Sequence, residues 1–246
     1  MHTERDVLDL AGVEVDLFRP NEELKVLAKK AVDMGLARAF DDPANVQLDS
    51  DAGREWQAAY DEVKDPWFNF TSGNGFYHFD KTWRDYPEIP HAFIKDYITK
   101  IEAGVDITRP IDAIIAERDR VVSEYRDLLD SDEDREAFDG KLGLARVVFP
   151  YVENHNFYIE HWTMSVIWRK VKELGAVFAK EGLMSAEDDI MFLKRDEVDE
   201  VLWDYYSAWA VNAPTASAHH WGPKIARRRE IHQKMLQLLI CFIGII

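Results

Sequence analysis

The sequence predicts a mainly α-helical protein of about eight helices, with one long central helix and little strand. The first indication is that apolar residues recur every three or four positions along most of the chain, which is the spacing of one helix face. The second is that proline, glycine and N-capping residues divide this pattern into segments of helical length. The third is a composition of 47% hydrophobic and 12% aromatic residues, typical of a chain that folds around a core.

Two helices are predicted in the N-terminal part of the chain. A short alternating run at residues 13–17 is typical of a small strand. Asn21 then has the position of an N-cap, and the helix that it begins ends at residues 41–43. Ser50 begins the second helix. This helix stops where Asp65 precedes Pro66, because the residue before a proline disfavours the helical conformation.

Three further helices are predicted before the centre of the chain. The first follows Pro90 and ends at Gly104, since glycine accepts the left-handed conformation found at helix ends. The next begins at Pro110. The third begins at Ser131, where the spacing is that of a capping box with Asp134 in the usual place of Glu or Gln.

The central helix carries Pro150, which either sits in its first turn or kinks one continuous helix. Apolar positions then continue to Gly182, where the helix is expected to stop. Residues 190–193 form a short apolar run, either one strand or one turn of buried chain. Asp196 caps a further helix, and the last helix begins near residues 220–223.

Charge and cysteine content exclude several classes of protein. A formal net charge of -16 argues against binding to nucleic acids or anionic membranes, since both need clustered Lys and Arg. The single cysteine, Cys241, allows neither an intrachain disulfide nor a cysteine-based zinc site. The sequence has no signal-peptide pattern and no apolar run of about 20 residues, so we expect a cytoplasmic protein without a membrane partner. We also expect no metal site, because the histidines lack the spacing of a helical metal-binding pair.

Polar residues crowd into the central helix between residues 153 and 161. At helical spacing they fall on several faces, whereas an ordinary amphipathic helix has one polar face. At least one set is therefore expected to point inward, where polar groups need partners or a ligand. The stretch is either a binding site or a buried hydrogen-bond network that only fixes the fold. Two of the sets are Glu153, Asn156 and Glu160, and Asn154, Tyr158, His161 and Ser165.

Two other segments have features of a binding site. Residues 66–79 are rich in Trp, Phe, Tyr and His around a Gly-Asn-Gly turn, and such a loop either encloses an aromatic ligand or packs as part of the core. Residues 227–229 are three consecutive arginines. They suit bidentate contact with a phosphate or a carboxylate, and the alternative is a solvated helix face.

Several motifs together resemble the helical region of the phosphoenolpyruvate-synthase-like phosphotransferases, a group that includes rifampicin phosphotransferase and the larger subunit of phenylphosphate synthase. They are Glu-Asn-His-Asn-Phe-Tyr-Ile at 153–159, Leu-Gly at 174–175, and Glu-Asp-Asp-Ile-Met-Phe-Leu at 187–193 with Glu197. The stretches 65–83 and 221–229 are also similar to the phenylphosphate-synthase side of the group. The sequence departs from the pattern at Met191 and Lys194. It also lacks an ATP-grasp signature and the phosphohistidine motif of the swivelling domain.

The resemblance implies that this chain is the acceptor-binding part of an ATP-dependent dikinase-type phosphotransferase, with a role in the metabolism of aromatic compounds. It would hold a phenolic or other aromatic hydroxyl compound and bind no cofactor itself. ATP and Mg²⁺ would be bound by partner ATP-grasp and phosphohistidine domains or subunits. Because those parts are missing, the chain is not expected to be catalytically complete alone. The alternative is a non-catalytic helical module that spaces or docks partner subunits.

The resemblance also implies roles for particular side chains. His155 or His161 would accept the hydroxyl proton, and Glu153 or Glu160 would orient that imidazole. An arginine from 227–229 would steady the transferring phosphoryl group. The residues expected to contact the substrate are Asn156, Tyr158, Trp162, Trp67, Phe76, Tyr77, His78, Arg227 and Arg228.

The expected organisation is a single helical acceptor-binding domain over residues 1–235, followed by an apolar tail at 236–246. The tail does not resemble the linker that follows this region in the family. It results from a truncation or a frame change, or it is a docking strip.

Overall fold

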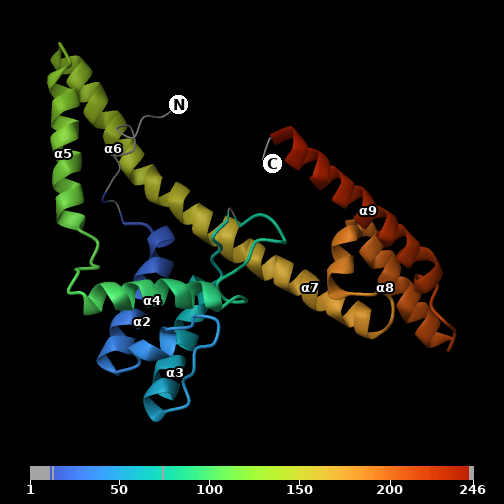
Figure 1. The fold of residues 1–246 in the computed structure, drawn as a ribbon. Helices are drawn as coiled ribbons and strands as arrows, with labels where there is room; N and C mark the ends of the chain where they lie inside the picture. Colours follow the sequence, from blue (N-terminus) through green and yellow to red (C-terminus); the bar gives the residue numbers. More distant parts are fainter. Residues whose placement is uncertain (1–11, 13, 74, 244–246) are drawn as a thin grey trace. The chain divides into compact units, whose positions relative to one another are not determined.

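A computed structural model describes residues 12, 14–73 and 75–243 of the chain (Figure 1). Among these residues there are eight α-helices and no strand, so the predicted fold class is confirmed. An isolated bridge between Thr71 and Thr82 is the extended pairing found there. The helices are α2 (Arg19–Asp33), α3 (Asp51–Trp67), α4 (Glu88–Glu102), α5 (Ile111–Asp127), α6 (Asp132–His155), α7 (Met164–Lys180), α8 (Arg195–Ala210) and α9 (Ser217–Ile243).

The chain divides into two units, Met1–Ser165 and Val166–Ile246, which we call the first and the second unit. The single domain expected over 1–235 spans parts of both. The long central helix is present as a joined run of 49 residues, made of α6, the π-helical segment η3 (Asn156–Thr163) and α7. It continues from the first unit into the second.

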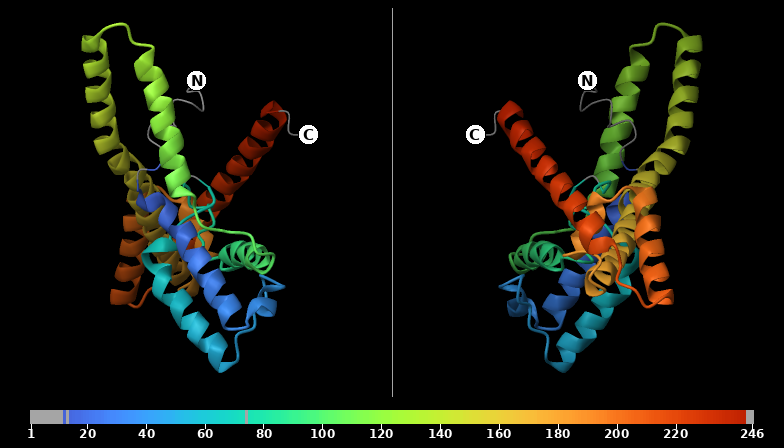
Figure 2. Two further views of the ribbon diagram at one scale, coloured as in Figure 1. Left: turned by 90° about the vertical axis from the view of Figure 1, so that its left-hand side faces the viewer. Right: turned by 90° about the vertical axis from the view of Figure 1, so that its right-hand side faces the viewer.

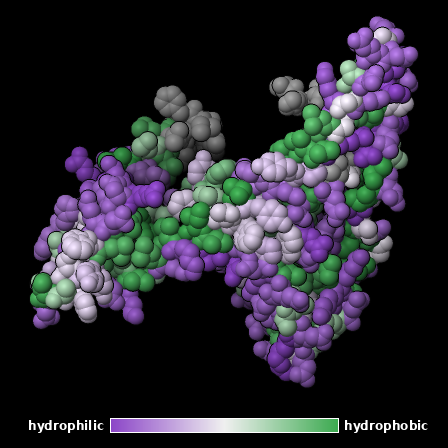
Figure 3. All heavy atoms as spheres, turned by 180° about the vertical axis from the view of Figure 1, so that it is seen from behind, coloured by the Kyte–Doolittle hydropathy of each residue, from purple (hydrophilic) through white to green (hydrophobic). Residues whose placement is uncertain are grey.

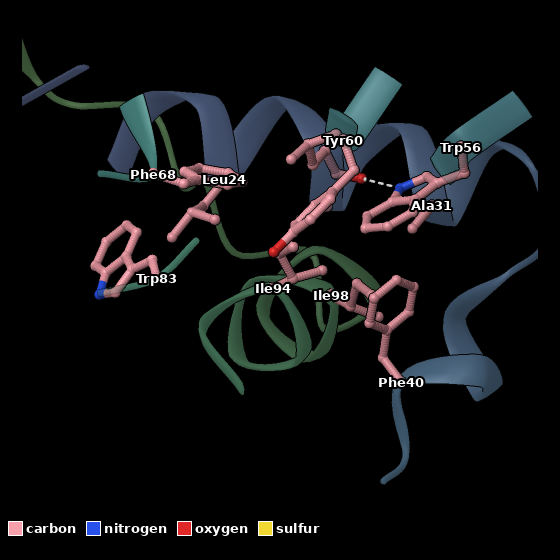
Figure 4. Close-up of a cluster of buried hydrophobic side chains, with 11 residues drawn as sticks. Leu24, Ala31, Phe40, Trp56, Tyr60, Phe68, Trp83, Ile94 and Ile98 are labelled. Carbon is pink, nitrogen blue, oxygen red and sulfur yellow. Dashed lines mark hydrogen bonds between the residues drawn. The ribbon is translucent and has the colours of Figure 1, made fainter. Parts of the chain in front are cut away.

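The core of the first unit lies between α2, α3 and α4, with the 3-10 segment η2 (Ala37–Phe40) at one end (Figure 4). Each helix contributes its predicted apolar face. The indole nitrogen of Trp56 donates a hydrogen bond of 2.9 Å to the carbonyl of Leu27, drawn as the dashed line in Figure 4. The fully buried members include Leu24, Ala28, Ala31, Phe40, Trp56, Phe68 and Ile94.

Several predicted helix ends are confirmed. The Ser50 hydroxyl accepts from the backbone N–H of Gly53 at 3.0 Å, and the Ser131 hydroxyl accepts from that of Asp134 at 3.0 Å. Both bonds satisfy an N–H that has no partner within the helix. Gly104 and Gly182 follow α4 and α7 with φ of +72° and +73°, which is the left-handed conformation expected of them.

The start of α2 and the run before it differ from the prediction. The helix begins at Arg19 and not at Asn21, because Pro20 fits the first turn, where its missing N–H costs nothing. The expected strand at 13–17 is wrong over its described residues, since Asp16–Phe18 is a 3-10 turn, η1. Val13 lies outside the described residues.

The helices α5 and α6 form an antiparallel pair, seen from two sides in Figure 2. Salt bridges link them, among them Arg126 to Asp139 at 3.1 Å. Pro150 lies inside one continuous helix and not in a first turn, so of its two predicted arrangements the continuous helix is present. Six residues later the helix widens into η3, where a π turn moves the following side chains round the axis.

The second unit packs α7, α8 and α9 around the 3-10 segment η4 (Glu187–Phe192). The run 190–193 is therefore mostly a turn of buried chain and not a strand. Gly175 lies so close to the carbonyl of Glu187 that a side chain there would overlap it. The helix α8 begins at Arg195, one residue before the predicted cap.

In the described residues, no helix has both the length and the apolar character that a membrane span requires.

Candidate functional site

One polar set of the central helix turns inward, as expected. Asn154, Tyr158, His161 and Ser165 each hydrogen-bond a residue from another part of the first unit. His161 and Ser165 are buried, and the other two are half-buried. Because every one of them bonds to protein, this face fixes η3 against the N-terminal segment and the aromatic loop.

The imidazole of His161 is held by one ring face and by one ring nitrogen. Its ring stacks on Phe70 with centroids 4.3 Å apart, and its Nδ1 accepts from the backbone N–H of Thr71 at 3.3 Å. Burial lowers the pKa of His161, while the charge of Asp80 opposes that shift. The ring is therefore neutral near pH 7, and the lone pair of Nδ1 already has a donor. Nε2 could accept a proton only in the tautomer that carries its hydrogen on Nδ1. The Thr71 N–H disfavours that tautomer, because it needs an unprotonated Nδ1 as its acceptor.

The remaining polar residues of the stretch lie at the surface or pair locally. His155 is exposed and Glu153 is half-buried. With its amide nitrogen turned towards Glu160, Asn156 donates to both carboxylate oxygens, at 3.0 and 3.1 Å. Within the described part of the chain, no hydrogen bond joins Glu153 or Glu160 to either predicted histidine. The two carboxylates are thus not placed to orient an imidazole base.

The aromatic loop divides into a packed inner part and an exposed outer part. The rings of Phe70 and Trp83 pack edge to face with their centroids 4.9 Å apart, and the Ser165 hydroxyl donates to the carbonyl of Asn69 at 3.0 Å. Gly75 lies against the carbonyl of Glu160, so the loop crosses η3 with no room for a side chain. Phe76, Tyr77 and Phe79 are exposed, and His78 is half-buried. The inner part therefore packs as core, the second of its two predicted roles.

Asp16 connects the polar helix to the N-terminal segment. Its backbone N–H donates to the Asn154 side chain at 2.7 Å, and the Tyr158 hydroxyl donates to its carboxylate at 3.1 Å. Burial and the neighbouring Asp16 raise the pKa of Tyr158, so the phenol keeps its proton. Trp162 lies beside Tyr158, with ring centroids 5.7 Å apart. Of the predicted contact residues, Tyr158 thus bonds Asp16 directly, and Trp162 packs against Tyr158.

A pocket of about 530 Å³ lies next to Asp16, and Trp67 is the predicted site residue that lines it. The Trp67 ring packs on the buried Phe157 at 5.2 Å, so it is anchored to η3 from behind. The guanidinium of Arg19 lies 5.8 Å from the Trp67 ring. The pocket is lined by Gly12, Glu14, Val15, Asp16, Phe18, Arg19, Glu22, Trp67, Thr108, Arg109 and Ile111.

Other lining residues of this pocket are ones that the sequence did not single out. Phe18 is 40% exposed, and the guanidinium of Arg109 lies 3.9 Å from its ring. The pocket therefore offers two aromatic side chains, two guanidinium groups and the carboxylates of Glu14, Asp16 and Glu22, and the Asp16 carboxylate accepts a hydrogen bond from Tyr158. Its volume lies in the range of small-molecule sites. Such a composition suits a planar ring that carries a polar or anionic group.

The motif residues of the second unit form buried ion pairs. Glu197 is buried and accepts from Arg228 at 2.8 Å and from Lys224 at 2.6 Å. These contacts, with the bond to Arg228 foremost, hold the pKa of Glu197 far below its usual range. Arg228 also donates to the carbonyl of Phe192 at 2.7 Å.

The neighbouring arginines differ in their surroundings. Arg229 pairs with the buried Asp189, whose other oxygen accepts from the backbone N–H groups of Ser185 and Ala186 at 3.0 and 3.1 Å. Arg227 is exposed. Of the arginines expected to hold a phosphoryl group, Arg228 is already bound to a carboxylate and Arg227 has its side chain in solvent.

No protein-family model, curated protein or solved structure matches the chain. The described residues contain no group of three or more His, Cys, Asp or Glu side chains that could hold a metal ion.

Proposed function

We propose that the first unit binds a small aromatic compound carrying a hydroxyl group, and presents it to a dikinase-type phosphotransferase. The observation that carries the proposal is the pocket that Trp67, Phe18 and Asp16 line together, with Asp16 hydrogen-bonded to the central helix. The resemblance of residues 153–159 and 187–193 to the acceptor-binding region of such enzymes supports the reaction class. ATP, Mg²⁺ and the phosphohistidine belong on partner domains or subunits.

The ring would lie between the two aromatic side chains. Trp67 is braced by Phe157 and Phe18 by Arg109, so both surfaces are oriented before a ligand arrives. Burying one aromatic ring against such surfaces contributes about 1–2 kcal/mol for each good contact. Arg109 would favour a ligand whose oxygen becomes phosphorylated, whereas Arg19 already pairs with Glu23 at 2.8 Å.

Asp16 is the residue best placed to receive the hydroxyl proton. In the transfer the N–P bond of the phosphohistidine breaks, an O–P bond forms at the acceptor oxygen, and the proton moves to a base. The Asp16 carboxylate accepts from Tyr158, which leaves its second oxygen for the ligand. The proposal thus moves the base from His155 or His161 to Asp16. Asn154 and Tyr158 become the residues that position it.

A ligand-binding experiment tests the proposal. We expect 4-methylphenol to raise the melting temperature of the full chain, and cyclohexanol, which has no aromatic ring, to have no effect at the same concentration. Phe18→Ala removes one wall of the pocket and should weaken binding about tenfold. The matched control is Phe76→Ala, an aromatic of similar exposure outside the pocket, 45% against 40%. It should bind as the wild type does.

Asp16→Asn and His155→Ala separate the two candidate bases. In a transfer assay with partner proteins that carry the phosphohistidine, Asp16→Asn should reduce the rate about a hundredfold or more while keeping the ligand bound. His155→Ala should leave the rate unchanged. The proposal is rejected if no phenol in a broad panel binds the wild type, and the role of Asp16 is rejected if only the histidine variant is slow.

The alternative is a non-catalytic module that spaces or docks partner subunits. The observation in its favour is that α6 buries none of its 24 residues and exposes Leu144, Val147 and Tyr151 by 65%, 76% and 74%. Hydrophobic side chains also reach the surface elsewhere, as Figure 3 shows. Under this alternative phenols do not bind, and Leu144→Ser abolishes association with the partner subunits.

A further inference from the structure

The helix α8 exposes a row of aromatic side chains. Trp203, Tyr206 and Trp209 are 69%, 58% and 71% exposed, although tryptophan and tyrosine usually bury most of their area. Their rings follow one another at centroid distances of 6.2 Å, with interplanar angles of 35° and 36°. They form a continuous surface along about two turns of the helix. An aromatic surface of this extent is typical of an interaction site.

Carboxylates lie along one side of this row. Asp199, Glu200 and Asp204 line a shallow hollow of about 500 Å³ together with Trp203 and Ser207. Asp204 accepts from the backbone N–H of Ala216 at 3.1 Å. Asp199 and Glu200 are exposed, and no cation of the described residues lies within ion-pair distance of them. The face is therefore both aromatic and negatively charged.

These two properties together select a cationic partner. The face of an indole ring attracts a guanidinium or ammonium group, and an adjacent carboxylate strengthens that attraction. Arginine satisfies both contacts at once, because its planar group stacks on a ring and bonds a carboxylate through its edge. From Asp199 to Trp209 the surface extends about 15 Å, more than one small cation covers. A helical peptide with cations on successive turns matches that length.

A second copy of this chain is a poor occupant of the same face. Two copies meeting face to face would bring Asp199 and Glu200 near their own counterparts, and like charges at an interface disfavour association. The net charge of -16 adds to that repulsion at long range.

We propose that the α8 face centred on Asp199, Trp203 and Tyr206, with Glu200 and Trp209 at its two opposite edges, is a docking surface for an arginine- and lysine-rich helical segment of a partner protein. The cations of that segment lie over the exposed rings and pair with the two carboxylates. The proposal rests only on the second unit, and it does not depend on the ring-binding pocket of the first.

Fluorine NMR of the full chain labelled with 5-fluorotryptophan tests the proposal. The probe is a synthetic amphipathic peptide of Ala, Leu and Arg with the 16-residue length of α8. Trp203→Phe and Trp209→Phe assign the two resonances. Both should shift on titration, and those of the buried Trp56 and Trp83 should not. Asp199→Asn with Glu200→Gln, and separately Trp203→Ala, should each weaken binding about tenfold or more.

Two controls have matched chemistry elsewhere in the chain. Glu133→Gln with Glu136→Gln removes the same charge from exposed positions on α6, and Tyr151→Ala removes an aromatic that is 74% exposed. Both should bind the peptide as the wild type does, and circular dichroism should show every variant folded. The proposal is overturned if neither tryptophan resonance shifts or if a peptide with Glu in place of Arg binds equally. The proposal is also overturned if the Glu133 and Glu136 substitutions weaken binding as much as those at Asp199 and Glu200. It is overturned as well if the chain forms a dimer that Trp203→Ala dissociates, because a second copy then occupies the face.

Discussion

The two units bury polar groups in different ways. In the first unit the buried polar residues are mostly neutral and hydrogen-bonded, among them Asn69, Thr71, His161 and Ser165. Glu23 is the charged member of that set among the described residues, and it pairs with Arg19 at 2.8 Å near the surface. In the second unit the buried polar residues are the carboxylates Asp189 and Glu197, each paired with an arginine of α9. Neutral bonds fix the position of a loop, whereas buried ion pairs make each partner necessary to the other.

This difference explains why one family-like pattern has two structural outcomes. The polar residues at 153–161 hold the N-terminal segment and the aromatic loop, and so shape the edge of a pocket. The acidic residues at 187–197 bind the arginines that had been expected to meet a phosphate. The first unit therefore carries the features of a ligand site, while the second is held together by its charges.

The largest effect is expected for Glu197→Gln. The change leaves Arg228 and Lys224 without their carboxylate, and because those cations are only partly exposed the cost should be about 2–3 kcal/mol. Amide hydrogen exchange should show the loss in α8 and α9. The exposed Glu200→Gln on the same helix should change stability by less than about 0.5 kcal/mol. Equal effects from the two variants would contradict the assignment of a buried ion pair.

The corresponding substitution in the first unit is Gly75→Ala. Its φ of +81° is unfavourable for alanine, and the new methyl group would overlap the carbonyl of Glu160. The cost should be about 2 kcal/mol, measured by chemical denaturation. Gly35→Ala is the control, since its φ is +70° but nothing lies within 4 Å of the added carbon. It should cost about 1 kcal/mol, so a cost equal to that of Gly75→Ala would mean that the loop does not lie against η3.

The two units should also respond to acid in different pH ranges. Burial lowers the folded-state pKa of His161 and His91 below 6.5, so the unfolded chain binds more protons there. The first unit should thus lose stability as the pH falls below about 6.5. For each histidine the free energy of unfolding should fall by up to about 1.4 kcal/mol per pH unit. The folded-state pKa of Glu197 lies below its ordinary 4.5, so the second unit should weaken only below about pH 4.5.

His161→Asn isolates the first of these effects, because its side chain can still accept from the Thr71 N–H but does not titrate. Its stability should fall less steeply between pH 6.5 and 5.5 than that of the wild type. The exposed His155→Asn should follow the wild type. Hydrogen exchange resolved by residue distinguishes the two units, and a loss that begins in α8 near pH 6 would contradict this assignment.

Local patterns in the sequence predicted most of the fold, and distance along the chain limited the prediction of the site. Ser50, Ser131, Gly104 and Gly182 act within a few residues of themselves, so their roles could be predicted. Helical spacing grouped Asn154, Tyr158, His161 and Ser165 as one set and predicted that at least one set turns inward, but it did not indicate which.

The partners of that set could not be predicted. Asp16 lies 138 positions from Asn154, and no spacing rule connects them. The pocket likewise joins Phe18, Trp67 and Arg109, which come from three separate segments. The phosphoryl-binding role of the arginines at 227–229 rests on the resemblance, and neither it nor their charge reveals that buried carboxylates bind two of them.

The central claim is that the first unit holds an aromatic ring beside Trp67, with its hydroxyl at Asp16. A crystal structure of the full chain with 4-methylphenol measures this directly. We predict a ring between Trp67 and Phe18 whose oxygen hydrogen-bonds the Asp16 carboxylate. A ring bound at His155 instead would contradict the account. So would an empty pocket in the crystal if 4-methylphenol binds the chain in solution.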